Sequence, residues 1–173
     1  TGIGGGILTE GRLLTGVRGI AGELGHFPIR ADGELCSCGN RGCYEKYAST
    51  TALVNMVRDR ADELVPDISA DHIDGQLIFN RVSQGDTALR SVVSEWITSI
   101  TLGLVGLIHI FNPQLVLIGG GVSQQEELFI EPLREQILSY TMPGFCKDLI
   151  IKSAQLGNNA GLLGAVAYLK NLF

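Results

Sequence analysis

The sequence predicts an α/β fold, in which short apolar strands alternate with helices. In the second half of the chain, apolar runs of strand length at 115–118 and 149–154 are each followed by a helical segment, and this alternation is typical of layered α/β domains. Apolar residues make up 45% of the 173 residues and charged residues 18%, so the chain can bury a core. We therefore expect one compact α/β domain.

The first half of the chain begins with a glycine-rich segment, TGIGGGILTEGRLLTG, at residues 1–16. Apolar residues alternate with glycine, and Glu10-Gly11 is a turn dipeptide, so this segment predicts a β-hairpin. Residues 44–64 have helical periodicity and are followed by Pro66, which predicts a single helix. A polar connection, 67–74, leads to a short helix at 77–83.

The most regular helical pattern runs from Thr87 to Ile110 and ends at Asn112-Pro113. Gly103 and Gly106 lie in its middle, where each glycine costs about 1 kcal/mol relative to alanine. We therefore expect close packing against another backbone at these positions. Ser, Thr, Gly and His interrupt the apolar run, which argues against a membrane span.

The apolar run Leu115–Ile118 is typical of a strand buried on both faces. Ser123 and Glu126 have the spacing of a capping box, so a helix is expected to begin at Ser123. Pro132 lies near the first turn of a second helical segment, which ends by Tyr140.

The end of the chain contains the second expected strand, at 149–154. A turn at 157–160 follows it. The last helix, at 161–172, is expected to close the domain.

The segment 25–45, GHFPIRADGELCSCGNRGCYE, holds three of the four cysteines and one of the three histidines. One imidazole and three thiolates form the ligand set of a closed, four-coordinate structural zinc site. Glycines around them allow the backbone to fold back on itself. The expected metal ligands are His26, Cys36, Cys38 and Cys43.

Other uses of these cysteines stay open. The spacing is not that of two CxxC pairs, and a catalytic cysteine is possible. A disulfide would use two of the four and leave two over, and Cys36 and Cys38 are too close in sequence to bridge comfortably. Cys146 lies far away and is expected to be a small buried apolar residue. Reduced thiols and the lack of a signal peptide favour the cytoplasm, and a net charge of −5 argues against nucleic acid as this segment's main partner.

Three glycine-rich turns lie at 1–6, 119–123 and 156–165. Glycine lets the backbone approach a ligand closely, and helix N-termini present free N–H groups to anions. None of the three matches the P-loop or the dinucleotide fingerprint. Any one of them alone is better explained as a tight turn, but three in one small domain favour a nucleotide phosphate as their ligand.

These segments together resemble the ROK family, named for repressors, open reading frames and kinases. The resemblance covers essentially the whole chain. It rests on TGIGGGILTEGRLLTGVRGIAGELGH, on CSCGNRGCYE, which is similar to the family's zinc motif, and on the later loops LVLIGGGVS and LGNNAGLLGA.

The resemblance implies an actin-like ATPase, ribonuclease H-like fold with two lobes around a cleft. Residues 1–173 would be the C-terminal lobe. It implies ATP-dependent phosphorylation of a hexose or N-acetylhexosamine with Mg-ATP, and often a homodimer, for which part of the apolar face of the 87–110 helix would serve. The alternative within the family is the sugar-sensing effector domain of a transcriptional repressor.

The resemblance also implies roles for individual residues. Glu23, His26 and Glu45 would hold sugar hydroxyls, since carboxylates accept paired hydrogen bonds from vicinal hydroxyls. Zinc would be structural, fixing the tautomer and aim of His26. Without the resemblance, both carboxylates are better interpreted as solvated groups near a turn or helix start. The residues implied at the nucleotide are Thr1, Gly2, Gly4, Gly5 and Gly6 at the phosphates and Gly120 and Gly121 on the nucleoside side.

The family's general base is an aspartate of the N-terminal lobe, and no aspartate of this chain matches it. Phosphoryl transfer depends on positioning by both lobes. No catalytic residue is therefore expected within residues 1–173, and this chain alone should not catalyse.

Overall fold

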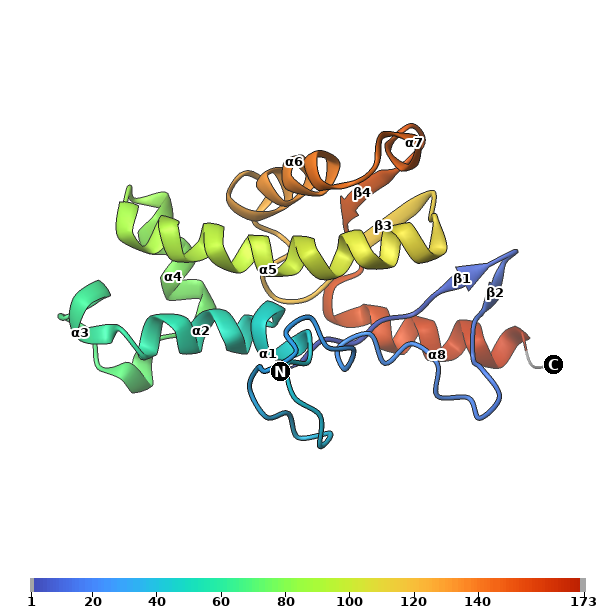
Figure 1. The fold of residues 1–173 in the computed structure, drawn as a ribbon, viewed down its shortest axis with the longest axis horizontal. Helices are drawn as coiled ribbons and strands as arrows, with labels where there is room; N and C mark the ends of the chain where they lie inside the picture. Colours follow the sequence, from blue (N-terminus) through green and yellow to red (C-terminus); the bar gives the residue numbers. More distant parts are fainter. Residues whose placement is uncertain (1, 172–173) are drawn as a thin grey trace.

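A long helix, α5 (Thr87–Phe111), crosses the middle of the molecule in the computed structural model, which describes residues 2–171 (Figure 1). The Asp86 side chain accepts a hydrogen bond from the Leu89 amide at 3.0 Å and caps the start of the helix. Asn112 adopts a left-handed conformation, φ 44°, and ends it. The expected helix is thus confirmed to within one residue.

By length and composition, α5 could cross a membrane, and it is the one such helix among the described residues. Half of that stretch is buried inside the protein. Trp96 and Ile97, for example, are almost fully enclosed. The core helix of a globular domain passes the same test, so the apolar character of α5 is accounted for by core packing.

The two glycines of α5 differ in their surroundings. A Cβ on Gly103 would overlap the ring of Tyr44, so the close neighbour is a side chain instead of the expected backbone. A Cβ on Gly106 would meet no described atom within 4 Å. The expectation of close packing is therefore correct in part at Gly103 and wrong at Gly106.

The helix expected at 44–64 is divided into three, α1 (Glu45–Ala48), α2 (Thr50–Arg58) and α3 (Ala61–Leu64). Ser49 adopts an extended conformation, with ψ 160°, and its hydroxyl accepts a hydrogen bond from the Ala52 amide at 3.1 Å. The single-helix prediction was wrong here because serine offers the backbone a cap in place of continued helix.

The helix α4 (Gly75–Ser83) follows a short 3₁₀ turn, Ala70–His72, and begins two residues before the expected start. The Asp74 carboxylate accepts a hydrogen bond from the Leu77 amide at 2.8 Å and caps it. Phe79 of α4 packs near Trp96 of α5 at a ring-centroid distance of 6.4 Å. These aromatic rings join α4 and α5 in the core.

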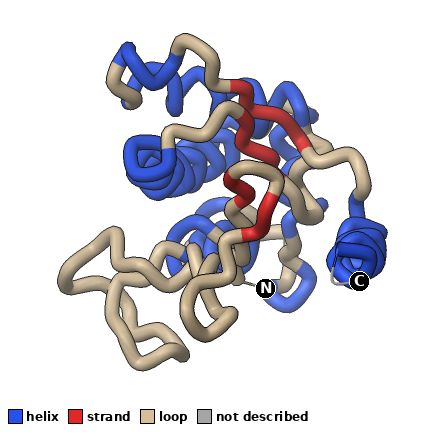
Figure 2. Tube along the Cα trace, turned by 90° about the vertical axis from the view of Figure 1, so that its right-hand side faces the viewer, coloured by secondary structure: helices blue, strands red, loops and turns tan. Residues whose placement is uncertain are grey.

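The strands form two small sheets, which lie between α5 and α8 in Figure 2. β1 (Leu8–Thr9) and β2 (Arg12–Leu13) make the expected hairpin, and Glu10 and Gly11 both have positive φ. β3 (Leu115–Ile118) and β4 (Ile150–Ser153) are parallel neighbours.

The expectation that β3 is buried on both faces was wrong. Leu115 and Leu117 are 47% and 58% exposed, whereas Val116 and Ile118 are half-buried against the core. Only one face of the strand is covered by the described residues. An apolar run identifies a strand but does not by itself reveal which faces are covered.

The segment after β3 also departs from the expected capping box. Ser123 is buried, and its hydroxyl donates to the Gly120 carbonyl at 2.8 Å instead of capping a helix. A π-helical turn, Glu126–Ile130, begins three residues later and continues into α6 (Glu131–Tyr140). The predicted end at Tyr140 was correct.

The C-terminal region contains α7 (Pro143–Cys146), a 3₁₀ turn (Gly157–Asn159) and α8 (Ala160–Asn171). The last helix exists, but it does not close the domain as expected. Its contacts with other described helices and strands are few. Its large apolar side chains are about half or more exposed: Leu162, Leu163, Val166, Tyr168 and Leu169.

Candidate functional site

The segment between His26 and Glu45 folds back on itself as two short antiparallel pairings. The Tyr44 amide donates to the Phe27 carbonyl at 2.9 Å, and the Cys36 amide donates to the Asn40 carbonyl at 2.8 Å. Gly42, with φ +72°, allows the sharpest approach, because a Cβ there would overlap the Arg30 carbonyl. We call residues 26–43 the metal loop.

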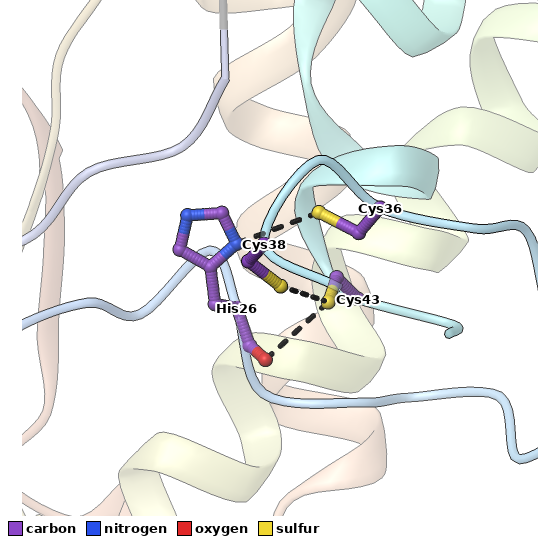
Figure 3. A group of neighbouring side chains, drawn as sticks. All are labelled: His26, Cys36, Cys38 and Cys43. Atoms are coloured by element: carbon purple, nitrogen blue, oxygen red, sulfur yellow. Dashed lines mark hydrogen bonds between the residues drawn. The ribbon is translucent and has the colours of Figure 1, made fainter. Parts of the chain in front are cut away.

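This fold brings the four expected metal ligands together (Figure 3). One ligand atom from each of His26, Cys36, Cys38 and Cys43 lies within 4.8 Å of all the others. The Cys38 and Cys43 sulfurs are 3.5 Å apart, and the Cys36 sulfur is 3.6 Å from His26 Nδ1. All cysteines are free thiols, so no disulfide competes among the described residues.

The donor set fits zinc. With Zn–S bonds of about 2.3 Å, tetrahedral ligand atoms are separated by about 3.8 Å, close to the two distances above. His26 presents Nδ1 to the sulfurs, while its other ring nitrogen points away from them in Figure 3. A metal held here would therefore leave Nε2 available to a second partner.

In the metal-free site, the pKa values of two thiols and of the His26 imidazole are shifted. Burial, together with contacts to the neighbouring thiols, raises the pKa of Cys43 to about 12. A hydrogen bond from the Asn40 backbone, followed by contacts to the other thiols, lowers the pKa of exposed Cys38. The contact with Cys36 and the nearby carboxylates raise the pKa of His26. Zinc must displace the protons that these groups hold.

The two carboxylates expected at the site both lie beside His26. Glu23 Oε2 is 3.8 Å from His26 Nε2, and Glu45 Oε1 is 3.8 Å from His26 Nδ1. Their exposure differs, since the Glu23 side chain is 73% exposed and the Glu45 side chain 17%. Glu45 is thus enclosed in the structure, although it is also the first residue of α1, where a carboxylate is favourable.

Glu45 also contacts one of the candidate metal ligands. The Cys36 thiol donates to Glu45 Oε1 at 3.3 Å. This bond needs the thiol proton, which metal binding would remove. The carboxylate then has free acceptor capacity for another donor.

The glycine-rich segment at the start of the chain packs directly against this cluster. A Cβ on Gly2 would overlap the Glu45 carboxylate, and a Cβ on Gly25 would overlap the Ile3 carbonyl. Glycine is therefore needed at Gly25, where the neighbour is backbone, whereas a side chain at position 2 would require the Glu45 carboxylate to move. Thr1, expected at the phosphates, lies outside the described residues.

The first two glycine-rich turns line one cavity of about 400 Å³. One wall contains residues 2–6, another contains 119–121, and apolar side chains of α5 line much of the rest. The described lining residues carry no charge, so an anion held there would depend on backbone N–H groups. The third turn, 156–165, is not among the described lining residues.

The remaining cysteine and the two remaining histidines lie outside the cluster. Cys146 is half-buried instead of buried, so the expectation for it is correct only in part, and its sulfur lies near the Leu138 and Thr141 carbonyls. His72 is exposed at the surface, and His109 lies in the last turn of α5, where Nε2 accepts from the Met142 amide at 3.1 Å.

Tyr44, which lies between the candidate ligand Cys43 and Glu45, was not predicted from the sequence to belong to the site. It is 2% exposed, and its hydroxyl donates to the Ile100 carbonyl of α5 at 2.7 Å. The one available signal was an aromatic residue directly after the last cysteine of the loop.

Comparisons with known proteins match the whole described region. The ROK family model matches residues 1–171. The glucokinase of Thermotoga maritima is 38% identical over 98% of this chain and 56% of its own length. A xylose repressor of Caldicellulosiruptor bescii is 34% identical over 96% of this chain and 43% of its own length.

A solved structure agrees with these sequences. The ROK family glucokinase from Streptomyces griseus, in complex with glucose and AMPPNP, superposes with a TM-score of 0.88 at 36% identity, covering 97% of this chain and 57% of that one. The chain therefore spans about half the length of the relatives it matches. Its α/β architecture and the match over residues 1–171 show that the chain belongs to the ROK family.

Proposed function

We propose that this chain is the sugar-, zinc- and nucleotide-binding C-terminal lobe of an ATP-dependent hexose kinase. In this proposal, the lobe has the actin-like, ribonuclease H-like topology of a two-lobed enzyme. The similarity to two glucokinases supports the reaction class, since one of them binds glucose and AMPPNP in its crystal structure.

One observation carries the proposal. The enclosed Glu45 carboxylate lies between His26 and the backbone of Gly2, so a candidate sugar group adjoins a candidate phosphate loop. A kinase must hold the acceptor hydroxyl beside the phosphoryl group, and such positioning supplies much of the catalysis. The contact between Glu45 and the glycine-rich segment at residues 2–6 is suited to holding a sugar hydroxyl beside a phosphoryl group.

We assign the roles as follows. Glu45, Glu23 and His26 Nε2 bind sugar hydroxyls, with the carboxylates accepting hydrogen bonds. Zinc held by His26, Cys36, Cys38 and Cys43 is structural and fixes the metal loop. Residues 1–6 approach the phosphates of Mg-ATP, and Gly120 and Gly121 the nucleoside. The general base lies outside residues 1–173, so the isolated chain is expected not to turn over ATP.

The second candidate is the sugar-sensing domain of a ROK repressor. It is favoured by the 34% identity to a xylose repressor, which extends over almost the whole chain. A sensor would need the sugar groups and the metal loop but no phosphoryl transfer. The glycines of residues 2–6 favour the kinase, since a sensor has no need for a phosphate loop.

A homodimer is the remaining part of the proposal. Leu102 and Ile110 of α5 are 50% and 72% exposed. Apolar side chains grouped on one helix are suited to contact with a second copy of the chain. Sedimentation analysis of the full-length protein and of Leu102→Glu would test it, because the charge should dissociate the dimer.

The test of function uses the full-length protein with Mg-ATP and a panel of hexoses and N-acetylhexosamines in a coupled assay. Glu45→Ala should weaken sugar binding by about 1.5–3 kcal/mol, the value of a charged hydrogen-bond partner. Glu23→Ala should weaken it less, because Glu23 is largely exposed. Glu63→Ala, an exposed carboxylate paired with Arg60, is the control.

The outcomes separate the two candidates. Turnover that is lost with Glu45→Ala supports the kinase. Sugar binding without turnover on any sugar of the panel supports the sensor. Unchanged sugar affinity in both glutamate variants, measured by calorimetry, would remove these residues from the site.

A further inference from the structure

Tyr44 connects the metal loop to the core of the protein. It follows the metal ligand Cys43 and precedes Glu45, and its side chain is 2% exposed. The centroid of its ring lies 5.2 Å from that of Phe27, which directly follows the candidate ligand His26. The position of this one ring therefore affects residues at both ends of the metal loop.

Two contacts with α5 hold the Tyr44 ring in place. Its hydroxyl donates to the Ile100 carbonyl at 2.7 Å across a separation of 56 residues. Its edge lies against Gly103, where a Cβ would overlap three ring atoms. Because glycine is costly in the middle of a helix, its presence at this point of contact indicates that α5 accommodates the ring.

The far end of α1 is held to the same helix. Trp96 Nε1 of α5 donates to the Ser49 carbonyl at 2.9 Å, and both residues are buried. α1 contains only Glu45–Ala48, so these two hydrogen bonds bracket it. A four-residue helix has little stability of its own, and its orientation must come from such contacts.

We propose that Tyr44, seated on Gly103, is a positioning residue that sets the geometry of the metal centre and of Glu45 relative to the core. It touches neither metal nor sugar and acts through its two neighbours in the chain. The part of this inference that concerns sugar rests on the proposed function, whereas the part that concerns the metal loop does not.

The experiment compares two glycines of one helix in the full-length protein. Gly103→Ala places a methyl group against the Tyr44 ring, whereas Gly106→Ala, three residues on, meets no described atom within 4 Å. Both changes remove a helix glycine, so intrinsic helix propensity affects both equally. Any difference between the two variants therefore comes from the neighbour.

Two readouts are measured for each variant. The first is the rate of zinc release to a chromophoric chelator, and the second is the dissociation constant for the best sugar of the panel. Gly103→Ala should raise both by about tenfold, the lower end of the range seen when the support of a metal ligand is disturbed. Gly106→Ala should leave both within about twofold of wild type.

Further variants distinguish positioning from general destabilisation. Ile137→Val, in the core on α6, lowers stability away from the loop and should leave zinc release unchanged. Tyr44→Phe keeps the ring and removes only the hydroxyl contact, so it should fold and still speed zinc release, though less than Gly103→Ala. In a Tyr44→Leu background, Gly103→Ala should add little, because the crowded ring is gone.

Equal behaviour of Gly103→Ala and Gly106→Ala, or an effect of Ile137→Val as large as that of Gly103→Ala, would overturn the proposal. If the wild-type protein binds no sugar, the proposed function fails, and zinc release still decides the positioning role.

Discussion

Replacement of Cys38 by serine should release zinc without disturbing the core. Cys38 is exposed, so its side chain contributes little apolar burial, whereas the other two loop cysteines are buried. Any loss of stability in Cys38→Ser is therefore attributable to the metal. Cys146→Ser, at a half-buried cysteine outside the cluster, is the matched control.

The expected magnitude follows from the four-ligand set. Structural zinc sites contribute about 10–16 kcal/mol of apparent binding free energy, so one ligand of four accounts for about 3 kcal/mol. That corresponds to roughly a hundredfold weaker zinc affinity. We expect stoichiometric zinc in the wild type and in Cys146→Ser, and much weaker retention in Cys38→Ser.

The assay combines elemental analysis, chelator competition and urea unfolding with and without EDTA. A ligand that binds only the folded state adds stability that disappears when the ligand is removed. Wild type and Cys38→Ser should therefore differ in untreated samples and coincide in EDTA. A wild type purified without zinc, or a Cys38→Ser protein with unchanged zinc affinity, would refute the assignment of the metal site.

Two further predictions concern the same loop. Because the pKa of Cys43 is about 12 in the metal-free state, its thiol stays protonated near neutral pH, and zinc must displace that proton. Because zinc displaces the Cys43 proton, zinc affinity should fall by at least about tenfold for each unit by which the pH is lowered. A chelator competition between pH 6 and 8 in which zinc affinity does not change with pH would contradict this prediction. Gly42→Ala should destabilise the loop by at least about 1–2 kcal/mol, the cost of a left-handed alanine, plus the overlap with the Arg30 carbonyl. Gly39→Ala, which has positive φ but no neighbour within 4 Å, isolates the backbone cost, and equal unfolding free energies for the two variants would exclude the overlap.

The convergence of the four candidate metal ligands could be predicted from the sequence because their chemistry is local. Four donors fell within eighteen residues, and glycines allowed them to converge. The ends of α5 and the hairpin turn at Glu10-Gly11 were correct for the same reason, since caps and tight turns are specified by a few adjacent residues.

The errors arose where distant residues decide the outcome. The break at Ser49 was missed because apolar periodicity continues through it into α2, while its carbonyl is bonded to Trp96, 47 residues away. Ser123 matched a capping pattern, but its hydroxyl bonds back to Gly120. Which face of β3 is covered likewise depends on neighbours that a single apolar run does not identify.

The metal loop should also be the first part of the protein to open when zinc is removed. Its two buried cysteines, Cys36 and Cys43, are themselves candidate metal ligands, and most of its other side chains are partly or fully exposed. Few apolar contacts therefore hold the segment, and regions of this kind open at lower free energy than the core. By contrast, α5 is fixed by buried side chains such as Trp96 and Ile97.

Hydrogen exchange in EDTA should show lost protection at the Cys36 and Tyr44 amides, which donate to carbonyls of the metal loop, and unchanged protection in the middle of α5. Simultaneous loss of protection in both regions would mean that zinc stabilises the whole domain, and unchanged protection in both would mean that the loop is ordered without the metal.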